Sequence, residues 1–332
     1  MTNSNYYLIV LFLISIYSCT NNENNNKLKN LHGDFIGQSL PKDSAEVFAP
    51  GVISTAYNER DAAFSPDGNE FFYSLKGTIG FSLIQTKIKD GVWQSPEVAS
   101  FSGNYSDIEP CFSRDGTKLF FVSNRPLTGE GEPKDYDIWF VEKINDGWGK
   151  PKNIGLPINT EANEFYPSFT EDGTIYFCAN YESGIGGEDL YYSVFKDGKY
   201  LSPINLGDSV NSVRDEFNSF VSSDGNFIIF TSMGWGTGFG GGDLWISFRK
   251  DVNSWTKPKN MGKQINSPYF EYCPSITPDG KYFFFTSNRS GEQSYSETLL
   301  TYDKIIEGLN STLNGSQNIY WISADFINGL NK

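Results

Sequence analysis

The chain has 332 residues, and its 40 acidic residues against 26 basic ones give a net charge of −14, with a single histidine, His32. This charge argues against nucleic-acid binding through a broad basic face, and one histidine rules out a metal site built from several imidazoles. Aromatic residues make up 16% of the chain and glycines number 33, a composition that favours β-strands joined by tight turns.

The chain begins with an apolar run at residues 6–17, which ends at Ser18-Cys19 and is followed by an asparagine-rich stretch. A helix of this length spans about 18 Å, less than the roughly 30 Å of a bilayer core, which is typical of the apolar part of a signal peptide. A small residue and a cysteine after such a run resemble the lipobox of bacterial lipoproteins. That resemblance implies a signal peptide at 1–18, cleavage before Cys19, acylation of Cys19 and a polar tether at 19–44. An ordinary secretion signal or a short membrane anchor is the alternative.

Asp-Gly pairs recur through the rest of the chain, each between two short apolar stretches. Glycine adopts the positive φ that a tight hairpin turn needs, so each pair predicts a β-hairpin. The aspartates stand 48 to 57 residues apart, at Asp67, Asp115, Asp172, Asp224 and Asp279. Five hairpins at a spacing of about 50 residues predict a β-propeller with five blades.

Each unit continues with a third apolar stretch and then a short fourth one. Proline in the fourth stretch suits the outer edge of a sheet, so we predict blades of four antiparallel strands. The fifth unit has no fourth strand after its third; residues 45–54 resemble the missing strand, and we expect them to complete the last blade. An insertion at about 290–317 has helix-like apolar spacing. The sequence thus predicts an all-β fold, a five-bladed propeller over 45–332 that is closed by an N-terminal strand.

The repeat resembles the WD-like β-propeller repeats of the TolB type. The resemblance is carried by segments such as EPCFSRDGTKLFFVSN at 109–124, and by the glycine-rich stretches GIGGEDL at 184–190 and GFGGGDL at 238–244. It covers residues 45–327 and implies the propeller fold. Because such repeats are common in periplasmic and lipid-anchored bacterial proteins, we expect an envelope lipoprotein, held at the outer membrane and facing the periplasm or the cell exterior.

An acidic residue stands eight positions before every Asp-Gly aspartate. These residues are Glu59, Asp107, Glu164, Glu216 and Glu271. Since they precede the innermost strand, we expect five carboxylates around one mouth of the channel, where a cation or a polar ligand could bind. Arg125, Trp235 and Arg289 lie in loops predicted at the same end and are further candidate ligand-binding residues. The alternative interpretation is structural: each carboxylate accepts hydrogen bonds from a neighbouring loop.

Two positions further on, the five units differ. They carry Asp61, Glu109, Tyr166, Asn218 and Cys273. Blades 1 and 2 therefore hold two acidic pairs, Glu59 with Asp61 and Asp107 with Glu109, and residues two apart on a strand share a face. Five-bladed glycosidases of the arabinanase type place catalytic carboxylates in a central funnel, and two carboxylates are the minimum for glycoside cleavage. By this analogy the four residues could form a hydrolase site.

Other motifs do not support catalysis. There is no G-x-S-x-G nucleophile motif, and the glycines at 236–241 match a dinucleotide fingerprint without the βαβ unit that it requires. Trp139, Trp245 and Trp321 are predicted to share one repeat position that packs between blades. We therefore favour a non-catalytic propeller that binds an envelope protein, peptide or glycan, with no cofactor beyond a possible cation at the acidic ring and no metal site. A glycan-active hydrolase is the alternative.

Overall fold

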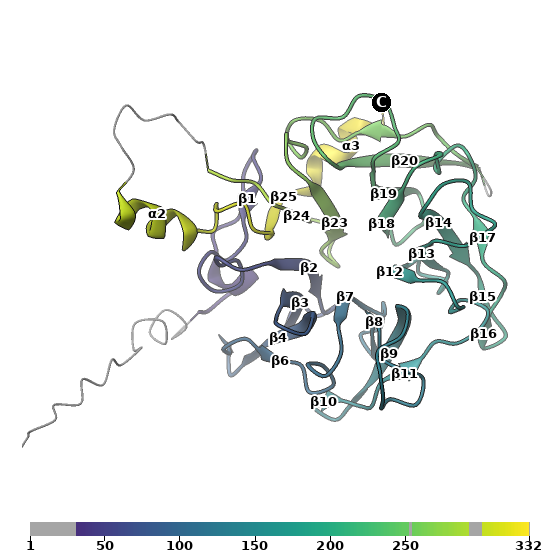
Figure 1. Ribbon diagram of the computed structural model, residues 1–332, viewed down its shortest axis with the longest axis horizontal. Coiled ribbons are helices and arrows are strands. Elements are labelled where there is room, and N and C mark those ends of the chain that lie inside the picture. Colours follow the sequence, from purple (N-terminus) through teal and green to yellow (C-terminus); the bar gives the residue numbers. More distant parts are fainter. Residues whose placement is uncertain (1–30, 252–253, 292–300, 332) are drawn as a thin grey trace, which may run out of the picture.

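The computed structural model describes residues 31–251, 254–291 and 301–331. Five antiparallel sheets stand around a central axis as the blades of a propeller (Figure 1). The predicted fold class is therefore confirmed. The predicted signal peptide, the predicted acylation site Cys19 and the first part of the predicted tether lie outside the described residues. None of the helices in the described ranges is long and apolar enough to span a membrane.

In the first four blades the strands follow one another in chain order from the axis outward, and in the fifth blade the outermost strand comes from the N-terminal part of the chain. The innermost strands are β2 (Glu59–Phe64), β7 (Asp107–Phe112), β12 (Glu164–Phe169), β18 (Glu216–Val221) and β23 (Glu271–Ile276). The second strands are β3 (Glu70–Lys76), β8 (Lys118–Ser123), β13 (Ile175–Ala179), β19 (Phe227–Ser232) and β24 (Tyr282–Ser287). The third strands are β4 (Phe81–Lys89), β9 (Asp137–Ile144), β14 (Asp189–Ser193), β20 (Asp243–Asp251) and β25 (Asn318–Ser323). The outermost strands are β6 (Glu97–Val98), β11 (Lys152–Asn153), β17 (Ile204–Asn205), β22 (Lys259–Asn260) and β1 (Glu46–Val47).

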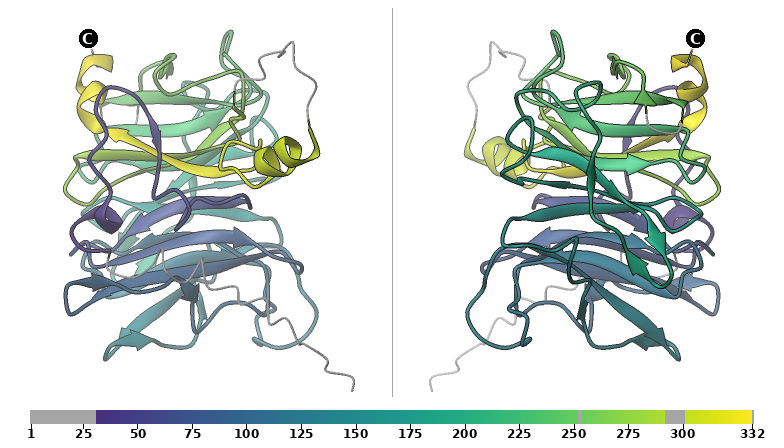
Figure 2. Two further views of the ribbon diagram at one scale, coloured as in Figure 1. Left: turned by 90° about the vertical axis from the view of Figure 1, so that its left-hand side faces the viewer. Right: turned by 90° about the vertical axis from the view of Figure 1, so that its right-hand side faces the viewer.

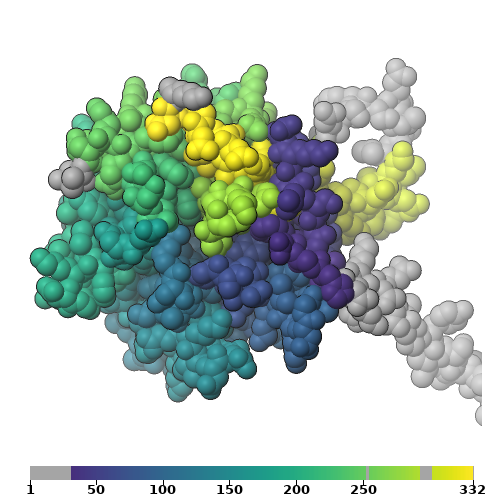
Figure 3. Space-filling view, turned by 180° about the vertical axis from the view of Figure 1, so that it is seen from behind, coloured from purple at the N-terminus to yellow at the C-terminus, as the bar shows by residue number. Residues whose placement is uncertain are grey.

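The last blade takes its outermost strand from the N-terminal part of the chain. In the antiparallel pair of β1 and β25, Glu46 stands opposite Trp321. The backbone N–H of Phe48, the residue directly after β1, donates to the carbonyl of Ile319 at 2.8 Å. The Phe48 side chain is fully buried and its ring lies 5.3 Å from the Trp321 ring. Figure 3 shows the N-terminal residues beside the C-terminal ones on the surface. The predicted closure of the ring by an N-terminal strand is confirmed.

The two ends of the propeller carry different connections. Short hairpins follow the third strands: β5 (Val92–Trp93), β10 (Gly147–Trp148) and β21 (Ser254–Trp255) extend them, whereas β15 (Phe195–Lys196) and β16 (Lys199–Tyr200) form a separate sheet in blade 3. The helices are η1 (Phe35–Gly37), α2 (Tyr302–Leu309), η2 (Ala324–Phe326) and α3 (Ile327–Leu330). Figure 2 shows α2 and α3 on opposite faces. We call the end with the Asp-Gly turns the turn face, and the opposite end, where the innermost strands begin, the loop face.

The Asp-Gly turns are held by bonds within the repeat motif itself. In each turn, a serine or threonine two residues before the aspartate donates its hydroxyl hydrogen to the aspartate, at 2.6 to 2.7 Å. The same carboxylate accepts the backbone N–H two residues later, as Thr174 donates to Asp172 at 3.0 Å. The following glycines have φ between 69° and 82°, which explains why glycine recurs there.

The tryptophans of the third strands confirm one expectation and correct another. Trp139 and Trp245 each stand two residues after the first residue of their strand, whereas Trp321 stands three residues after Asn318. Tyr320 therefore takes the shared position in blade 5, and the prediction that the three tryptophans share one position is wrong for Trp321. Because successive side chains of a strand point to opposite faces, Trp321 packs on the other face of its blade. All three rings are buried, as expected of packing residues.

Candidate functional site

The repeated acidic residues hold the loops that enter the innermost strands. All five are buried. In blade 3, Glu164 accepts the backbone N–H of Thr160 at 3.2 Å and its hydroxyl at 2.7 Å. Blades 1, 4 and 5 repeat this arrangement with the pairs Thr55–Glu59, Ser212–Glu216 and Ser267–Glu271. Burial raises the pKa of Glu164 to about 7, and the bonds from Thr160 oppose the rise. This geometry is that of the structural interpretation, in which each carboxylate fixes a loop.

Two of the candidate arginines extend the same arrangement. Asp107 accepts the hydroxyl of Ser102 at 2.7 Å and Nη2 of Arg125 at 2.7 Å. The Arg125 guanidinium is buried and lies 5.0 Å from the centre of the Phe121 ring. In blade 5, Nε of Arg289 donates to Glu271 at 3.2 Å. Both arginines thus bind carboxylates of their own blade.

The residues two positions after the repeated acidic residues form a ring inside the channel. They are Asp61, Glu109, Tyr166, Asn218 and Cys273. These five residues have φ between 47° and 65°, and each lies at a β-bulge where the register of the innermost strand shifts. A bulge interrupts the alternation of side chains along a strand. Glu59 and Asp61 therefore have separate partners, although they stand two residues apart. The structure divides the four carboxylates of the hydrolase hypothesis into two groups: Glu59 and Asp107 bind the loops before their strands, and Asp61 and Glu109 face the channel.

Arg60 links the two carboxylates in the channel. Its Nε donates to Asp61 at 2.9 Å and its Nη2 to Glu109 at 2.7 Å. Its guanidinium also lies 4.9 Å from the centre of the Tyr272 ring. The side chains of Asp61 and Glu109 expose 2% and 3% of their surface, so this is a buried triad.

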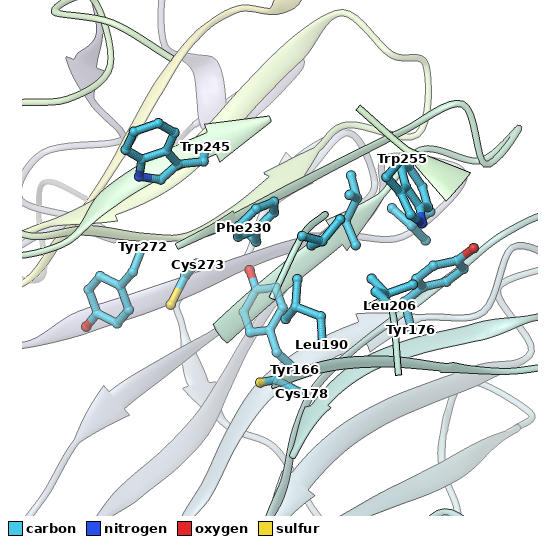
Figure 4. Close-up of a cluster of buried hydrophobic side chains, with 13 residues drawn as sticks. Tyr166, Tyr176, Cys178, Leu190, Leu206, Phe230, Trp245, Trp255, Tyr272 and Cys273 are labelled. Carbon is cyan, nitrogen blue, oxygen red and sulfur yellow. The ribbon is translucent and has the colours of Figure 1, made fainter. Parts of the chain in front are cut away.

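The remaining blades contribute to the same network. Glu109 accepts the backbone N–H of Tyr166 at 2.7 Å and Nδ2 of Asn218 at 3.0 Å. Arg60 Nη2 also reaches Sγ of Cys273 at 3.2 Å. Figure 4 shows Tyr166 and Cys273 among the buried side chains of the neighbouring blades. We call Arg60, Asp61, Glu109, Tyr166, Asn218 and Cys273 the channel cluster.

The channel cluster carries more negative than positive charge when both carboxyl groups are ionised. Burial raises the pKa of Glu109 to about 7; Arg60 opposes the rise and the neighbouring Asp61 adds to it. Burial thus favours the protonated form of Glu109, and the ion pair with Arg60 favours the ionised form.

A cavity of about 360 Å³ lies in the channel on the turn-face side of this cluster. Asp61, Glu109 and Tyr166 line its inner end, and Phe112, Phe169 and Phe220 are among its walls. Its mouth is lined by the residues directly before the Asp-Gly pairs, which are Pro66, Arg114, Glu171, Ser223 and Pro278. The cavity thus opens at the turn face, the end of the propeller opposite the repeated acidic residues. The signal that could have located it is the variation of these five residues within an otherwise fixed turn motif.

Trp235 lies apart from the channel cavity. Its indole N–H donates to the carbonyl of Val210 at 2.7 Å, and Nζ of Lys257 lies 5.7 Å from its ring centre. It lines a cleft of about 210 Å³ together with Arg214 and Trp245. Among the residues that the structure describes, no group of three or more histidine, cysteine or acidic side chains could hold a metal ion.

Comparisons with known proteins bear on the fold. No family model matches the chain, and no curated protein matches its sequence. A protein of Agrobacterium tumefaciens assigned to TolB is similar in structure, with a TM-score of 0.48, 16% identity, and coverage of 80% of this chain and 90% of that one. TolB from Acinetobacter baumannii gives 0.46 and 14% over 81% of this chain and 55% of that one. The α-L-arabinofuranosidase PaAbf62A of Podospora anserina gives 0.47 and 12% over 85% and 94%. The propeller fold is established by the five sheets of the chain itself, and function has to be argued from the site.

Proposed function

We propose that this chain is a non-catalytic, lipid-anchored propeller of the bacterial envelope, which binds a segment of a partner protein in its channel cavity. The observation that carries the proposal is the cavity itself: about 360 Å³, open at the turn face and lined differently by each blade. Rigid concave sites with mostly apolar walls and a few polar groups are typical of ligand binding. The lipobox-like Ser18-Cys19 and the polar residues after it support the anchor and the envelope location.

The hydrogen bonds of the channel carboxylates favour binding over catalysis. Asp61 accepts bonds from Arg60, from the Ser74 hydroxyl and from the backbone N–H of Glu109. Both oxygens of Glu109 likewise accept bonds from groups of the protein. A nucleophile or general acid must present an oxygen or a proton to the substrate. These carboxylates instead hold the inner end of the cavity in one shape.

The chemistry of the walls favours a polypeptide partner. Pro110, Pro167 and Pro274 line the cavity together with phenylalanines and Ile276. Such surfaces bury apolar side chains by the hydrophobic effect. A glycan would need a denser set of hydrogen-bonding groups, so a protein segment is the better occupant.

The proposal is tested by partner capture from the native envelope. Phe220→Trp places a larger ring in the cavity wall, and Leu127→Trp adds the same ring at an exposed loop position, where Leu127 is 66% accessible. We expect a stoichiometric partner protein with the wild-type chain and with Leu127→Trp, and its loss with Phe220→Trp. A partner that is retained by Phe220→Trp would contradict the channel as the binding site.

A glycoside hydrolase remains the second candidate, and one observation favours it. Asp61 and Glu109 both line the cavity, and the pKa of Glu109 near 7 is suited to a general acid. Turnover of an oligosaccharide panel that is abolished in Glu109→Gln would establish this function in place of binding. If the wild-type protein hydrolyses none of these oligosaccharides, the hydrolase function is ruled out.

A further inference from the structure

A groove of about 570 Å³ lies on the turn face between blades 2 and 3. It has Ser113, Arg114, Phe169 and Glu171 in common with the channel cavity, so the two hollows meet at these residues. The Arg114 guanidinium donates to the carbonyl of Phe169 at 2.6 Å and fixes this junction. An extended segment bound in one hollow therefore lies next to the other.

The walls of the groove expose large apolar side chains. Leu156 is 83% accessible and Phe195 is 44% accessible. Phe195 belongs to the hairpin of β15 and β16, which forms a sheet separate from the rest of blade 3, and its ring packs 4.9 Å from that of Tyr200. Ile154 and Phe140 line the blade 2 side. Exposed apolar patches of this kind mark surfaces that bind a partner.

The groove also holds three cationic side chains, Arg114, Lys118 and Lys199, beside two acidic ones, Asp115 and Glu171. Within the described ranges, no ion pair joins Arg114, Lys118 or Lys199 to a carboxylate. The ammonium of Lys118 instead lies 5.1 Å from the centre of the Phe140 ring. The two acidic residues of the groove are engaged locally: Asp115 accepts bonds within its own turn, and Glu171 accepts the hydroxyl of Ser223. The cations of the groove outnumber its acidic residues by three to two, so in a chain of net charge −14 this surface favours an acidic partner.

We propose that this groove binds an extended polypeptide segment that carries both apolar and acidic side chains and belongs to the same partner as the segment in the channel cavity. This inference rests on the proposed function, because it extends that binding site outward. Aliphatic side chains such as Ile154 and Leu156 suit peptide side chains better than sugar rings, and Lys118 and Lys199 attract the carboxylates. The junction at Arg114 lets one segment occupy both hollows.

The test is a selection of random linear peptides against the purified mature chain, followed by fluorescence polarisation with the enriched peptides. We expect peptides that combine Asp or Glu with aromatic or aliphatic residues. The double variant K118E/K199E should weaken their binding by about tenfold or more, since it places two negative charges opposite acidic side chains. The matched control K250E/K263E makes the same charge change at exposed lysines of blade 4 and the loop after it, and should alter affinity by less than about twofold.

The outcomes separate this inference from the proposed function. Loss of binding in K118E/K199E, in Leu156→Glu and in the channel variant Phe220→Trp supports both. If Phe220→Trp abolishes binding and the two groove variants do not, the groove inference is wrong and the channel site stands. If only the groove variants matter, the groove binds peptide and the channel function fails. Enriched peptides without acidic residues would overturn the inference. Binding of polygalacturonate to the wild-type chain, measured by calorimetry and abolished in K118E/K199E, would overturn it as well.

Discussion

Replacing Arg60 with methionine removes the guanidinium that joins Asp61 and Glu109 at the centre of the propeller. The two ion pairs measure 2.9 and 2.7 Å, and both carboxylates are almost completely buried. Removing one partner of a buried ion pair leaves uncompensated charge and costs about 3–5 kcal/mol. We expect Arg60→Met to lower the free energy of unfolding by about this amount at pH 8.

The loss should depend on pH because of Glu109, whose pKa burial raises to about 7. A carboxyl group with a higher pKa in the folded chain stabilises the fold below its unfolded pKa, and this contribution is lost as the pH rises through the folded pKa. Removing Arg60 raises the pKa of Glu109 further. The destabilisation should therefore shrink by about 1–2 kcal/mol between pH 8 and pH 5, since one pKa unit corresponds to about 1.4 kcal/mol.

Urea unfolding followed by tryptophan fluorescence, at pH 5 and pH 8, measures these differences. Glu109→Gln keeps the shape of the side chain and removes its charge, so it serves as the matched partner in a double-mutant cycle. Arg60→Met combined with Glu109→Gln should lose less stability than the sum of the two single variants at pH 8, and its loss should vary little with pH. A pH-independent loss in Arg60→Met, or strict additivity in the cycle, would refute the reasoning.

Three further predictions follow from the seam, the turns and the N-terminus. Phe48→Ala empties a fully buried site at the closing strand and should lower the free energy of unfolding by about 3–5 kcal/mol in urea titrations, whereas Leu40→Ala, at a 54% accessible position, should change it little. The Thr170 hydroxyl lowers the pKa of Asp172. A lowered pKa stabilises the fold above the pKa of the unfolded chain, and this stabilisation is lost as the pH falls through the pKa of the folded chain. Thr170→Val should therefore cost about 1 kcal/mol at pH 7 and lose less stability than the wild type between pH 5 and pH 3, measured by thermal unfolding; an equal acid-induced loss would contradict this. Cys19→Ala should abolish incorporation of labelled palmitate, and unchanged labelling would contradict the lipid anchor.

Repetition made the fold predictable. The Asp-Gly turns are local structures in which a hydroxyl and a carboxylate two residues apart bind one another, so each copy of the motif specifies its own hairpin. The closing strand was also predictable, because residues 45–54 resemble the fourth strands of the other blades. The position of Trp321 was not predictable. It depends on the register between β24 and β25, and an insertion separates these two strands in the sequence.

The candidate site was less predictable, because the sequence does not show backbone bulges. Alternation along a regular strand would place Glu59 and Asp61 on one face. The structure instead gives Asp61 a φ of 65°, and this left-handed residue joins the channel cluster while Glu59 binds Thr55. The same shift in all five blades explains why four carboxylates that are close in sequence separate into loop and channel groups. The cavity is hard to predict for a related reason: its walls come from all five innermost strands, which lie far apart in the sequence.

Repeat symmetry separates the structural residues from those that we propose to bind the partner. The acidic column is the same in every blade because every blade has the same loop to fix, and its hydrogen bonds show that task being performed five times. A partner segment has no fivefold symmetry, so a surface that recognises one must differ from blade to blade. Arg114, Glu171 and Ser223 occupy equivalent positions with positive, negative and neutral side chains, and they lie where the channel cavity opens. The asymmetry of the turn face, rather than the regular acidic ring of the loop face, is therefore the feature that variants such as Phe220→Trp and K118E/K199E should disturb.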